Sequence, residues 1–197
     1  MLGCLALPAS ALILIPKGNF ENGNTDWVEA SGGGVTTFSY PTSGGSGGGG
    51  YGLISNAGGW AVLVNPPAAG NVGGGWPIAT VGVTAGITNT FSRDLKTFSG
   101  LNNGGMKVEA WAGNAIIGNS GDVRPAAGPA YADWTTFTFN WLVPPATEKM
   151  IFVPLWGADS SVGVDNVGLV PEPSTYALLA LGAAGLGGHL IRRRRRS

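Results

Sequence analysis

The tryptophans are the residues of this chain best suited to hold a ligand, and all seven precede residue 171. Sugars present patches of C–H groups that lie on Trp and Tyr rings, while amides and carboxylates bind sugar hydroxyls. Trp111 follows Lys107 and Glu109 at alternate positions, which predicts a side open to solvent or to a groove. Trp76 stands in a Gly-Gly-Gly-Trp-Pro loop. We therefore expect a carbohydrate platform at Trp111 and then at Trp76, with ordinary packing as the alternative for both rings.

The residue types that most enzymes use are scarce. The one histidine, His189, lies in the C-terminal tail, so Ser-His, Cys-His and His-metal sites are excluded from the preceding domain. The Gly-rich runs lack the Lys-Ser/Thr and the helix of a phosphate-binding loop. A glycosidase needs only two carboxylates, but no motif pairs any two of the acids. We expect no enzymatic activity.

Charge narrows the choice of partner. Residues 12–171 carry six basic and ten acidic side chains, a net charge of −4, and the bases form no stripe. A mildly acidic surface of this kind argues against nucleic acid and anionic lipid as partners of the domain. The segment contains no cysteine, so disulfides do not stabilise it.

The C-terminal tail combines a proline turn, an apolar stretch and a basic cluster. Pro171 and Pro173 interrupt regular structure. Residues 174–191 contain no charged side chain apart from His189, and as a helix of about 27 Å they would nearly cross the ~30 Å hydrocarbon core. The sequence predicts a single transmembrane helix, with a permanent anchor or a buried helix as alternatives. A basic cluster beside such a helix stays cytoplasmic, which places the preceding domain outside. The cluster consists of Arg192, Arg193, Arg194, Arg195 and Arg196.

These three parts, in this order, resemble the PEP-CTERM sorting signal of Gram-negative bacteria. The resemblance covers residues 170–197 and includes Pro171, Glu172 and Pro173 as the PEP motif. It implies that an exosortase, a membrane protease and transpeptidase, removes the tail at this motif during export. Members of that family are surface or matrix proteins of bacteria that make extracellular polysaccharide. We therefore expect transient anchoring in the inner membrane, then release to the cell surface or extracellular matrix.

The other end of the chain has features of a secretory signal. The run MLGCLALPASA is apolar and ends in Ala9-Ser10-Ala11, a small-x-small cleavage site. A basic n-region is missing, because the first basic residue is Lys17. We expect residues 1–11 to be the remnant of a signal peptide whose start is truncated. An incidental role for Cys4 is favoured over a lipoprotein cysteine.

Residues 12–169 are predicted to form one all-β domain, an antiparallel β-sandwich. Gly and Pro interrupt nearly every window of ten residues, and strand-like runs alternate with turns. Phe137, Phe139 and Trp141 fall on one face of such a run, and threonines fall on the other. The Gly-rich segment 43–52 predicts a flexible loop. The expected strands are 12–15, 34–39, 51–55, 60–64, 87–95, 106–112, 115–118, 135–142, 149–155 and 163–170.

The ends of this domain and one late strand carry landmarks of a known sandwich. GNFENGNTDW at 18–27, WTTFTFNWLVPP at 134–145 and VGVDNVGLV at 162–170 resemble the jelly roll of galactose-binding-like and carbohydrate-binding-module families. The resemblance implies that the last strand pairs beside the first, and that Trp27 and Trp134 lie in the core, where we also expect Trp141.

The same resemblance implies a structural Ca²⁺ where the first and last strands meet. Its ligands would be Glu21, Asp165 and backbone carbonyls, since Ca²⁺ takes six to eight oxygens. Asn19 and Asn166 are further oxygen donors nearby. A turn capped by Glu21 and a solvated Asp165 are the alternative.

Two kinds of function remain open at this point. The first is an exported, non-catalytic surface or matrix protein whose exposed tryptophans bind extracellular polysaccharide. The second is a structural or adhesive component of the surface or of a biofilm, with no soluble ligand. A hydrolytic enzyme would require a clustered pair of buried carboxylates.

Overall fold

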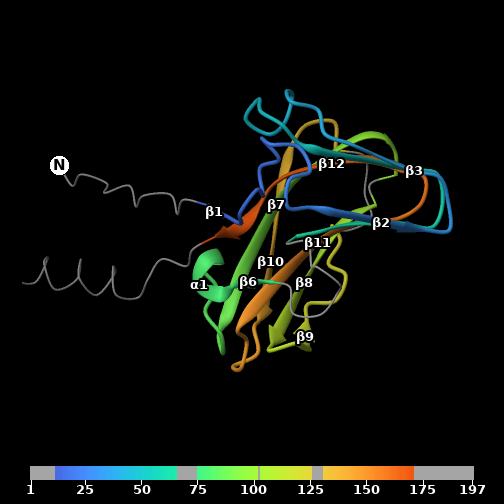
Figure 1. Cartoon of the computed structure of the whole chain (residues 1–197). Coiled ribbons are helices and arrows are strands. Elements are labelled where there is room, and N and C mark those ends of the chain that lie inside the picture. Colours follow the sequence, from blue (N-terminus) through green and yellow to red (C-terminus); the bar gives the residue numbers. More distant parts are fainter. Residues whose placement is uncertain (1–11, 66–74, 102, 126–130, 171–197) are drawn as a thin grey trace, which may run out of the picture.

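A computed structural model describes residues 12–65, 75–101, 103–125 and 131–170, which form a sandwich of two antiparallel sheets (Figure 1). Sheet A has the order β10-β7-β12-β4-β3, with β1 also paired to β12. Sheet B has the order β2-β5-β11-β8-β9, with β6 also paired to β11. The strands are β1 (Ile13–Leu14), β2 (Val28–Gly32), β3 (Thr36–Ser39), β4 (Gly52–Asn56), β5 (Trp60–Val64), β6 (Trp76–Pro77), β7 (Thr88–Gly100), β8 (Gly104–Ala112), β9 (Ala115–Asn119), β10 (Thr135–Leu142), β11 (Lys149–Trp156) and β12 (Ser160–Val170), and one helical turn, α1 (Ile78–Val81), follows β6.

The predicted all-β sandwich is confirmed, and each expected run contains a strand. The sequence missed β2 and β6. The first is an edge strand whose VEASG sequence lacks alternating large apolar residues, and the second has only two residues, the last of them Pro77. Strand β7 extends five residues beyond its predicted end at residue 95. Its later residues pair with β12, a contact that no local pattern reveals.

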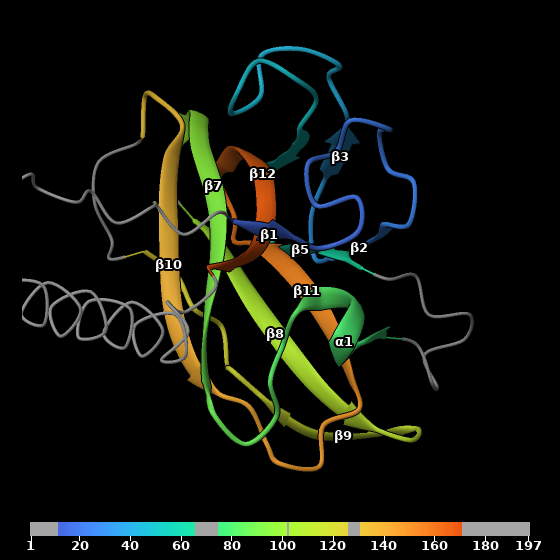
Figure 2. The same ribbon diagram turned by 90° about the vertical axis from the view of Figure 1, so that its left-hand side faces the viewer.

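The first and last strands meet, as the resemblance implied. Ile13 pairs with Leu169 and Leu14 with Gly168. A side chain at Gly168 would overlap the Ile13 carbonyl oxygen, so glycine permits this close approach. The two ends of the described chain therefore lie on neighbouring strands, as Figure 1 and Figure 2 show.

Alternate residues of the central strands fill the space between the sheets. Phe137, Phe139 and Trp141 face inward from β10 and pack against the core, as expected. Phe91 of β7 stacks on Phe139 with ring centroids 5.4 Å apart. Trp27 is 4% exposed and stacks on Phe20, which confirms its predicted core position.

The prediction for Trp134 is wrong. This ring is only partly buried and belongs to neither apolar cluster of the described residues. Because residues alternate along β10, Trp134 shares the side of Thr136, which faces away from the core. Its indole Nε1 donates a hydrogen bond to the Gly44 carbonyl at 2.8 Å, and the ring contacts Tyr51 edge-on. Trp134 therefore belongs to the outer face of sheet A.

One charged side chain lies inside the sandwich. Arg93 of β7 is 1% exposed and its guanidinium lies 5.9 Å and 5.8 Å from the rings of Phe137 and Phe139. Its Nη2 donates to the Val123 carbonyl at 3.1 Å, which links sheet A to the edge of sheet B. Burial lowers the Arg93 pKa to about 10. Since the residue remains charged at neutral pH, the aromatic faces and the carbonyl offset its desolvation.

Candidate ligand-binding faces

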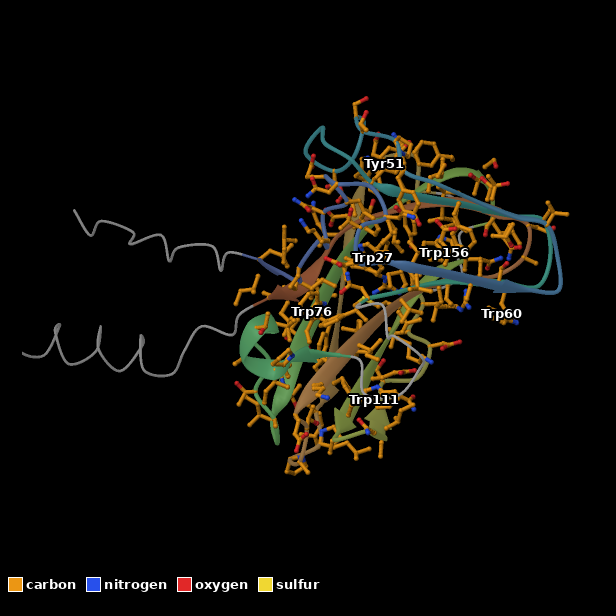
Figure 3. All side chains as sticks on the ribbon, viewed as in Figure 1. Trp27, Tyr51, Trp60, Trp76, Trp111 and Trp156 are labelled. Carbon is orange, nitrogen blue, oxygen red and sulfur yellow. The ribbon has the colours of Figure 1, made fainter. Side chains whose placement is uncertain are left out.

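The outer face of sheet B carries two indoles, of which Trp60 is exposed and Trp111, expected to be open to solvent or to a groove, is buried. Strand β8 turns its even-numbered residues into the core, so Lys107, Glu109 and Trp111 lie on the outer face. Strand β5 turns Ala61 and Leu63 inward, which places Trp60 on the same outer face. Figure 3 shows these two indoles at separate ends of this layer. On β11, Lys149 lies opposite Trp111 and Trp156 lies opposite Ala61, the neighbour of Trp60. These two positions are seven residues apart along the strand, which corresponds to about 23 Å.

Trp111 lies in an apolar cluster on this face. Its side chain is 8% exposed and packs with Ile151 and Val153. The indole Nε1 donates to Glu109 Oε2 at 3.3 Å, while Lys107 Nζ lies 2.7 Å from Glu109 Oε1. One carboxylate is therefore held between an ammonium group and an indole. The arrangement places an ion pair beside an apolar cluster whose three main side chains are each 8% exposed or less.

Trp60 is the more open ring. It is 52% exposed and pairs with Gly32 of β2. A Cβ atom at Gly32 would lie 2.9 Å from the indole, so the missing side chain allows the ring to lie over the sheet. The exposed part of Trp60 is available to a flat apolar ligand. No role was predicted for Trp60, because its pairing with Gly32 depends on the strand register and cannot be predicted from the sequence around either residue.

Trp76 lies on the other side of sheet B. It pairs with Met150, a core residue, and its partly buried ring packs against the core. Its Nε1 donates to Asn65 Oδ1. The structure therefore does not bring Trp76 and Trp111 onto one face. A sugar-binding role for Trp76 stays a prediction, and it would involve only the exposed part of this ring.

Two carboxylates lie opposite each other on the outer face of sheet A. Asp94 of β7 pairs with Asp165 of β12, and they are 6% and 3% exposed. Ser46 joins them, because its backbone N–H donates to Asp165 Oδ2 at 2.8 Å and its hydroxyl donates to Asp94 Oδ2 at 2.6 Å. Thr136 Oγ1 donates to Asp94 Oδ1, and the Asn166 backbone N–H donates to Asp165 Oδ1. Each carboxylate oxygen therefore accepts a hydrogen bond from this chain.

The Gly-rich segment folds over this pair in a defined turn. Gly45 N–H donates to the Gly49 carbonyl and Gly48 N–H donates to the Gly45 carbonyl, both at 2.9 Å. A Cβ at Gly45 would lie 2.7 Å from Asp165 Oδ2, so glycine allows the backbone to reach the carboxylate. Composition predicted a flexible loop, whereas Ser46 fixes it through the two aspartates.

Glu21, the predicted partner of Asp165, reaches the same turn. A Cβ at Gly49 would overlap the Glu21 carboxylate, so that carboxylate lies against the loop backbone. Burial, followed by the charges of Asp94 and Glu21, raises the Asp165 pKa from 3.8 to about 7, although two backbone N–H groups oppose the shift. Sequence reasoning missed Asp94, whose place depends on strand register. Among the described residues, no three His, Cys, Asp or Glu side chains are grouped to hold a metal ion.

Several predicted features lie outside the described residues. They are the signal remnant 1–11, the helix 174–191, the PEP motif (Pro171, Glu172 and Pro173) and the basic cluster 192–196. Within 12–65, 75–101, 103–125 and 131–170, no helix has the length and apolar character needed to cross a membrane.

The C-terminal resemblance is confirmed by comparison with protein families. Residues 169–196 match the PEP-CTERM protein-sorting motif, and the chain thus carries this motif. The motif implies export and sorting to the cell envelope of Gram-negative bacteria. Among curated proteins, no sequence matches the chain significantly.

Several solved structures with a similar fold are carbohydrate-binding modules. A family 16 carbohydrate-binding module has a TM-score of 0.52 and 19% identity, covering 80% of this chain and 99% of that one. The CBM22-1 xylan-binding domain of Paenibacillus barcinonensis Xyn10C has a TM-score of 0.51 and 14% identity, covering 85% and 99%. The enzymatically active domain of tailspike protein 4 from bacteriophage CBA120 has a TM-score of 0.59 and 11% identity, covering 80% of this chain and 22% of that chain. At these identities the likeness shows the fold.

Proposed function

We propose that this protein is an exported, non-catalytic surface or matrix protein that binds extracellular polysaccharide and is processed by an exosortase. The sorting motif at 169–196 supports the processing step. In this proposal residues 174–191 form a transient transmembrane helix and Arg192–Arg196 hold its end in the cytoplasm. Cleavage at the motif formed by Pro171, Glu172 and Pro173 then releases the sandwich to the cell surface or the polysaccharide matrix.

The outer face of sheet B supports polysaccharide binding. Trp60 offers an exposed indole at one end, and Trp111 lies at the other beside the Lys107–Glu109 ion pair. Apolar rings can bind the C–H faces of sugars, and the ion pair can bind their hydroxyls. A spacing of about 23 Å suits an extended chain better than a single sugar. The exposed indole of Trp60 is the observation that carries this part of the proposal.

The same structure supports a non-catalytic role. The buried pair Asp94 and Asp165 is the clustered carboxylate pair that a hydrolase would need. A glycosidase places its carboxylates on opposite sides of the scissile bond, with room for the sugar between them. Here Ser46 occupies that place and bonds to both carboxylates. The pair is therefore suited to holding the loop rather than to cleaving a substrate.

A structural Ca²⁺ at Glu21 and Asp165 is part of the proposal. The donor set fits a hard cation, because two carboxylates and the carbonyls of the glycine-rich turn are all oxygen ligands. Burial is the main cause of the raised Asp165 pKa, and the charges of Asp94 and Glu21 add to it, so a bound cation would favour the ionised carboxylate. Bound Ca²⁺ would thus stabilise the junction of the turn with the end of β12. Asn166 donates to Asp94 through its Nδ2 at 2.9 Å and would orient that neighbouring carboxylate.

Titration with polysaccharides tests the binding proposal. Soluble xylan, suggested by the xylan-binding neighbour, and the producer's own exopolysaccharide are the first probes. Tryptophan fluorescence is followed with and without Ca²⁺ in the parent protein and in Trp60→Ala, Trp111→Phe and Trp76→Ala. We expect a saturable shift whose affinity falls at least tenfold in Trp60→Ala, about 1.4 kcal/mol. The control is Leu142→Ala, which removes an exposed apolar side chain from the other sheet.

An unchanged fluorescence signal with every polysaccharide, in a folded protein, would overturn the binding proposal. It would favour the second candidate, a structural or adhesive surface protein without a soluble ligand. The sorting proposal has its own test, in which the chain is expressed with and without an exosortase. Cleavage should require the enzyme and should stop when Pro171, Glu172 and Pro173 are replaced by alanine. Equal processing in both strains would contradict it.

A further inference from the structure

The outer face of sheet A carries a shallow groove of about 350 Å³, away from every site assigned above. Its floor is a row of hydroxyl side chains that runs across four strands. Thr37 pairs with Ser55, Ser55 with Ser161, and Ser161 with Ser99. With neighbouring strands about 4.8 Å apart, this row is about 14 Å long. The remaining lining residues are Val35, Asn56, Ala57, Asp159 and Ser160.

The hydroxyl row is suited to a ligand with many hydroxyl groups. A hydroxyl both donates and accepts hydrogen bonds, so such a row can match either orientation of an alcohol group. Ser55 Oγ and Ser161 Oγ lie 2.8 Å apart and already bond to each other, which leaves further lone pairs on both. Asp159 is the one charged residue of the lining. The groove therefore favours a neutral polyol over an ionic ligand.

An aromatic ring borders this row because of a local irregularity in the sheet. Between the pairs Ser161–Ser99 and Val162–Thr97 the register shifts by one residue, and Phe98 is the extra residue. Such a bulge re-aims a side chain. Phe98 is 44% exposed and lies next to Ser99 in the sequence.

The ring of Phe98 is held in place from below. It stacks on Tyr51 at 5.5 Å with an angle of 3°, and Tyr51 contacts Trp134 at 5.3 Å. All three rings meet over Gly163, where a Cβ atom would lie within 3.2 Å of each. Lys96 Nζ lies 5.5 Å from the Phe98 centroid. Figure 3 shows Tyr51 in the upper layer, on the opposite side of the sandwich from Trp111.

We infer that this groove binds a second neutral polysaccharide chain, with the Thr37–Ser99 row on its hydroxyls and the exposed part of Phe98, at the border of the groove, against a sugar ring. This inference rests on the proposed function, because it assumes the same class of ligand. The two binding faces lie on the outer sides of opposite sheets, so one polysaccharide chain cannot cover both without wrapping round the domain. A single domain would therefore cross-link two chains of the matrix. Each bound chain would also raise the local concentration of polysaccharide available to the other face.

Light scattering tests cross-linking directly. The full-length chain, at one copy per detergent micelle, is mixed with soluble xylan or with the producer's purified exopolysaccharide over a wide range of ratios. A bivalent protein should give a scattering maximum at intermediate ratios that disappears when protein is in excess. We expect Phe98→Ala and Ser99→Glu to reduce this maximum at least tenfold while the part of the fluorescence shift that is lost in Trp60→Ala remains. Leu142→Ala, also an exposed site on sheet A, is the matched control.

Each other outcome has a defined meaning. If both groove variants scatter like the parent protein, the inference is overturned and the proposed function stands. The same holds if a Trp60→Ala, Trp111→Phe double variant loses all binding, because the groove would then hold nothing. If the parent protein binds neither polysaccharide, the proposed function and the inference both fail. If the protein scatters without polysaccharide and Phe98→Ala stops this, the groove is a protein interface, which also overturns the inference.

Discussion

The two outer faces of the sandwich are built on the same alternation of residues but differ in what buries them. On sheet B the strands bury their own apolar side chains against each other, as Trp111 does with Ile151 and Val153. On sheet A the outward residues include the polar pair Asp94 and Asp165, which the glycine-rich turn covers.

The difference separates stability from binding. Sheet B exposes Trp60, whose removal should change the stability of the fold little. Sheet A instead buries carboxylates that accept hydrogen bonds from side chains such as Ser46 and Thr136. Removing a group from the first face should mainly affect a ligand. Removing a carboxylate that holds the glycine-rich turn on the second face should mainly affect folding. Substitutions on the two faces should therefore differ in whether they change stability or ligand binding.

Asp94→Ala should have the largest effect on stability. It removes the acceptor for the hydroxyls of Ser46 and Thr136 and for the amide of Asn166. Losing these three hydrogen bonds to a buried carboxylate should lower the free energy of unfolding by about 3 kcal/mol and the melting temperature by about 9 °C. Chemical and thermal denaturation measure both. Asp122→Ala, at an exposed acid, is the control, and equal losses in the two variants would contradict the role given to Asp94.

Asp165 should give the calcium-free protein a pH dependence. Its pKa rises from 3.8 to about 7 on folding, so between these values the folded state holds a proton that the unfolded state has released. The free energy of unfolding is therefore raised at the acidic end of this window and falls as the pH rises from about 4 to about 7. Unfolding curves in chelator, compared with those of Asp165→Asn, isolate this component. Parallel curves for the two proteins would show that it is absent.

Calcium should act on the same residue. At pH 7 added Ca²⁺ should raise the melting temperature of the parent protein, because it binds the folded state alone. Asp165→Asn and Glu21→Gln should each weaken this response. A melting temperature that does not change with Ca²⁺ in the parent protein would exclude the proposed cation site.

Gly163→Ala should lower the free energy of unfolding by about 1–2 kcal/mol, within the range expected for overpacking. The new Cβ would lie 2.9 Å from Trp134, 3.0 Å from Phe98 and 3.2 Å from Tyr51. Near-ultraviolet circular dichroism should show the loss of this ring arrangement, and denaturation gives the energy. Adding Phe98→Ala to the variant should restore part of the loss, since space returns beside the new methyl group. Simple additivity would argue that the three rings are not coupled at Gly163.

Trp60→Ala should have the smallest effect on folding. A side chain that is 52% exposed over a glycine should change the free energy of unfolding by no more than about 0.5 kcal/mol. Denaturation compared with Leu142→Ala, another exposed apolar site, provides the check. A loss several times larger would mean that Trp60 stabilises the sheet, which would weaken its assignment to a ligand.

Much of the fold could be predicted from local pattern, and most of the site could not. Alternation placed Phe137, Phe139 and Trp141 on the inner face because strand geometry fixes that relation within eight residues. The carboxylate pair depends on which strands become neighbours, and Asp94 and Asp165 are far apart in the sequence. No local signal marks Asp94 as different from other acids.

The structure differs from the sequence-based expectation at Trp134 and at the segment 43–52, for two different reasons. The sequence analysis placed Trp134 in the core because of its similarity to family landmarks, although alternation with Phe137 and Phe139 puts it on the outer side. The segment 43–52 was predicted to be flexible from its composition alone. The aspartate side chains that hold it lie on other strands. Ser46 is the residue that changes this loop into an ordered turn, and its partners lie on two distant strands.

Nuclear magnetic resonance of the seven indole N–H groups would test the central claim most directly. Each tryptophan gives its own signal, and the buried rings of Trp27 and Trp156 serve as internal controls. During titration with a polysaccharide that the protein binds, the account predicts saturable shifts of Trp60 and Trp111, with Trp27 and Trp156 unchanged. Binding that leaves Trp60 and Trp111 unchanged would contradict a polysaccharide site on the outer face of sheet B.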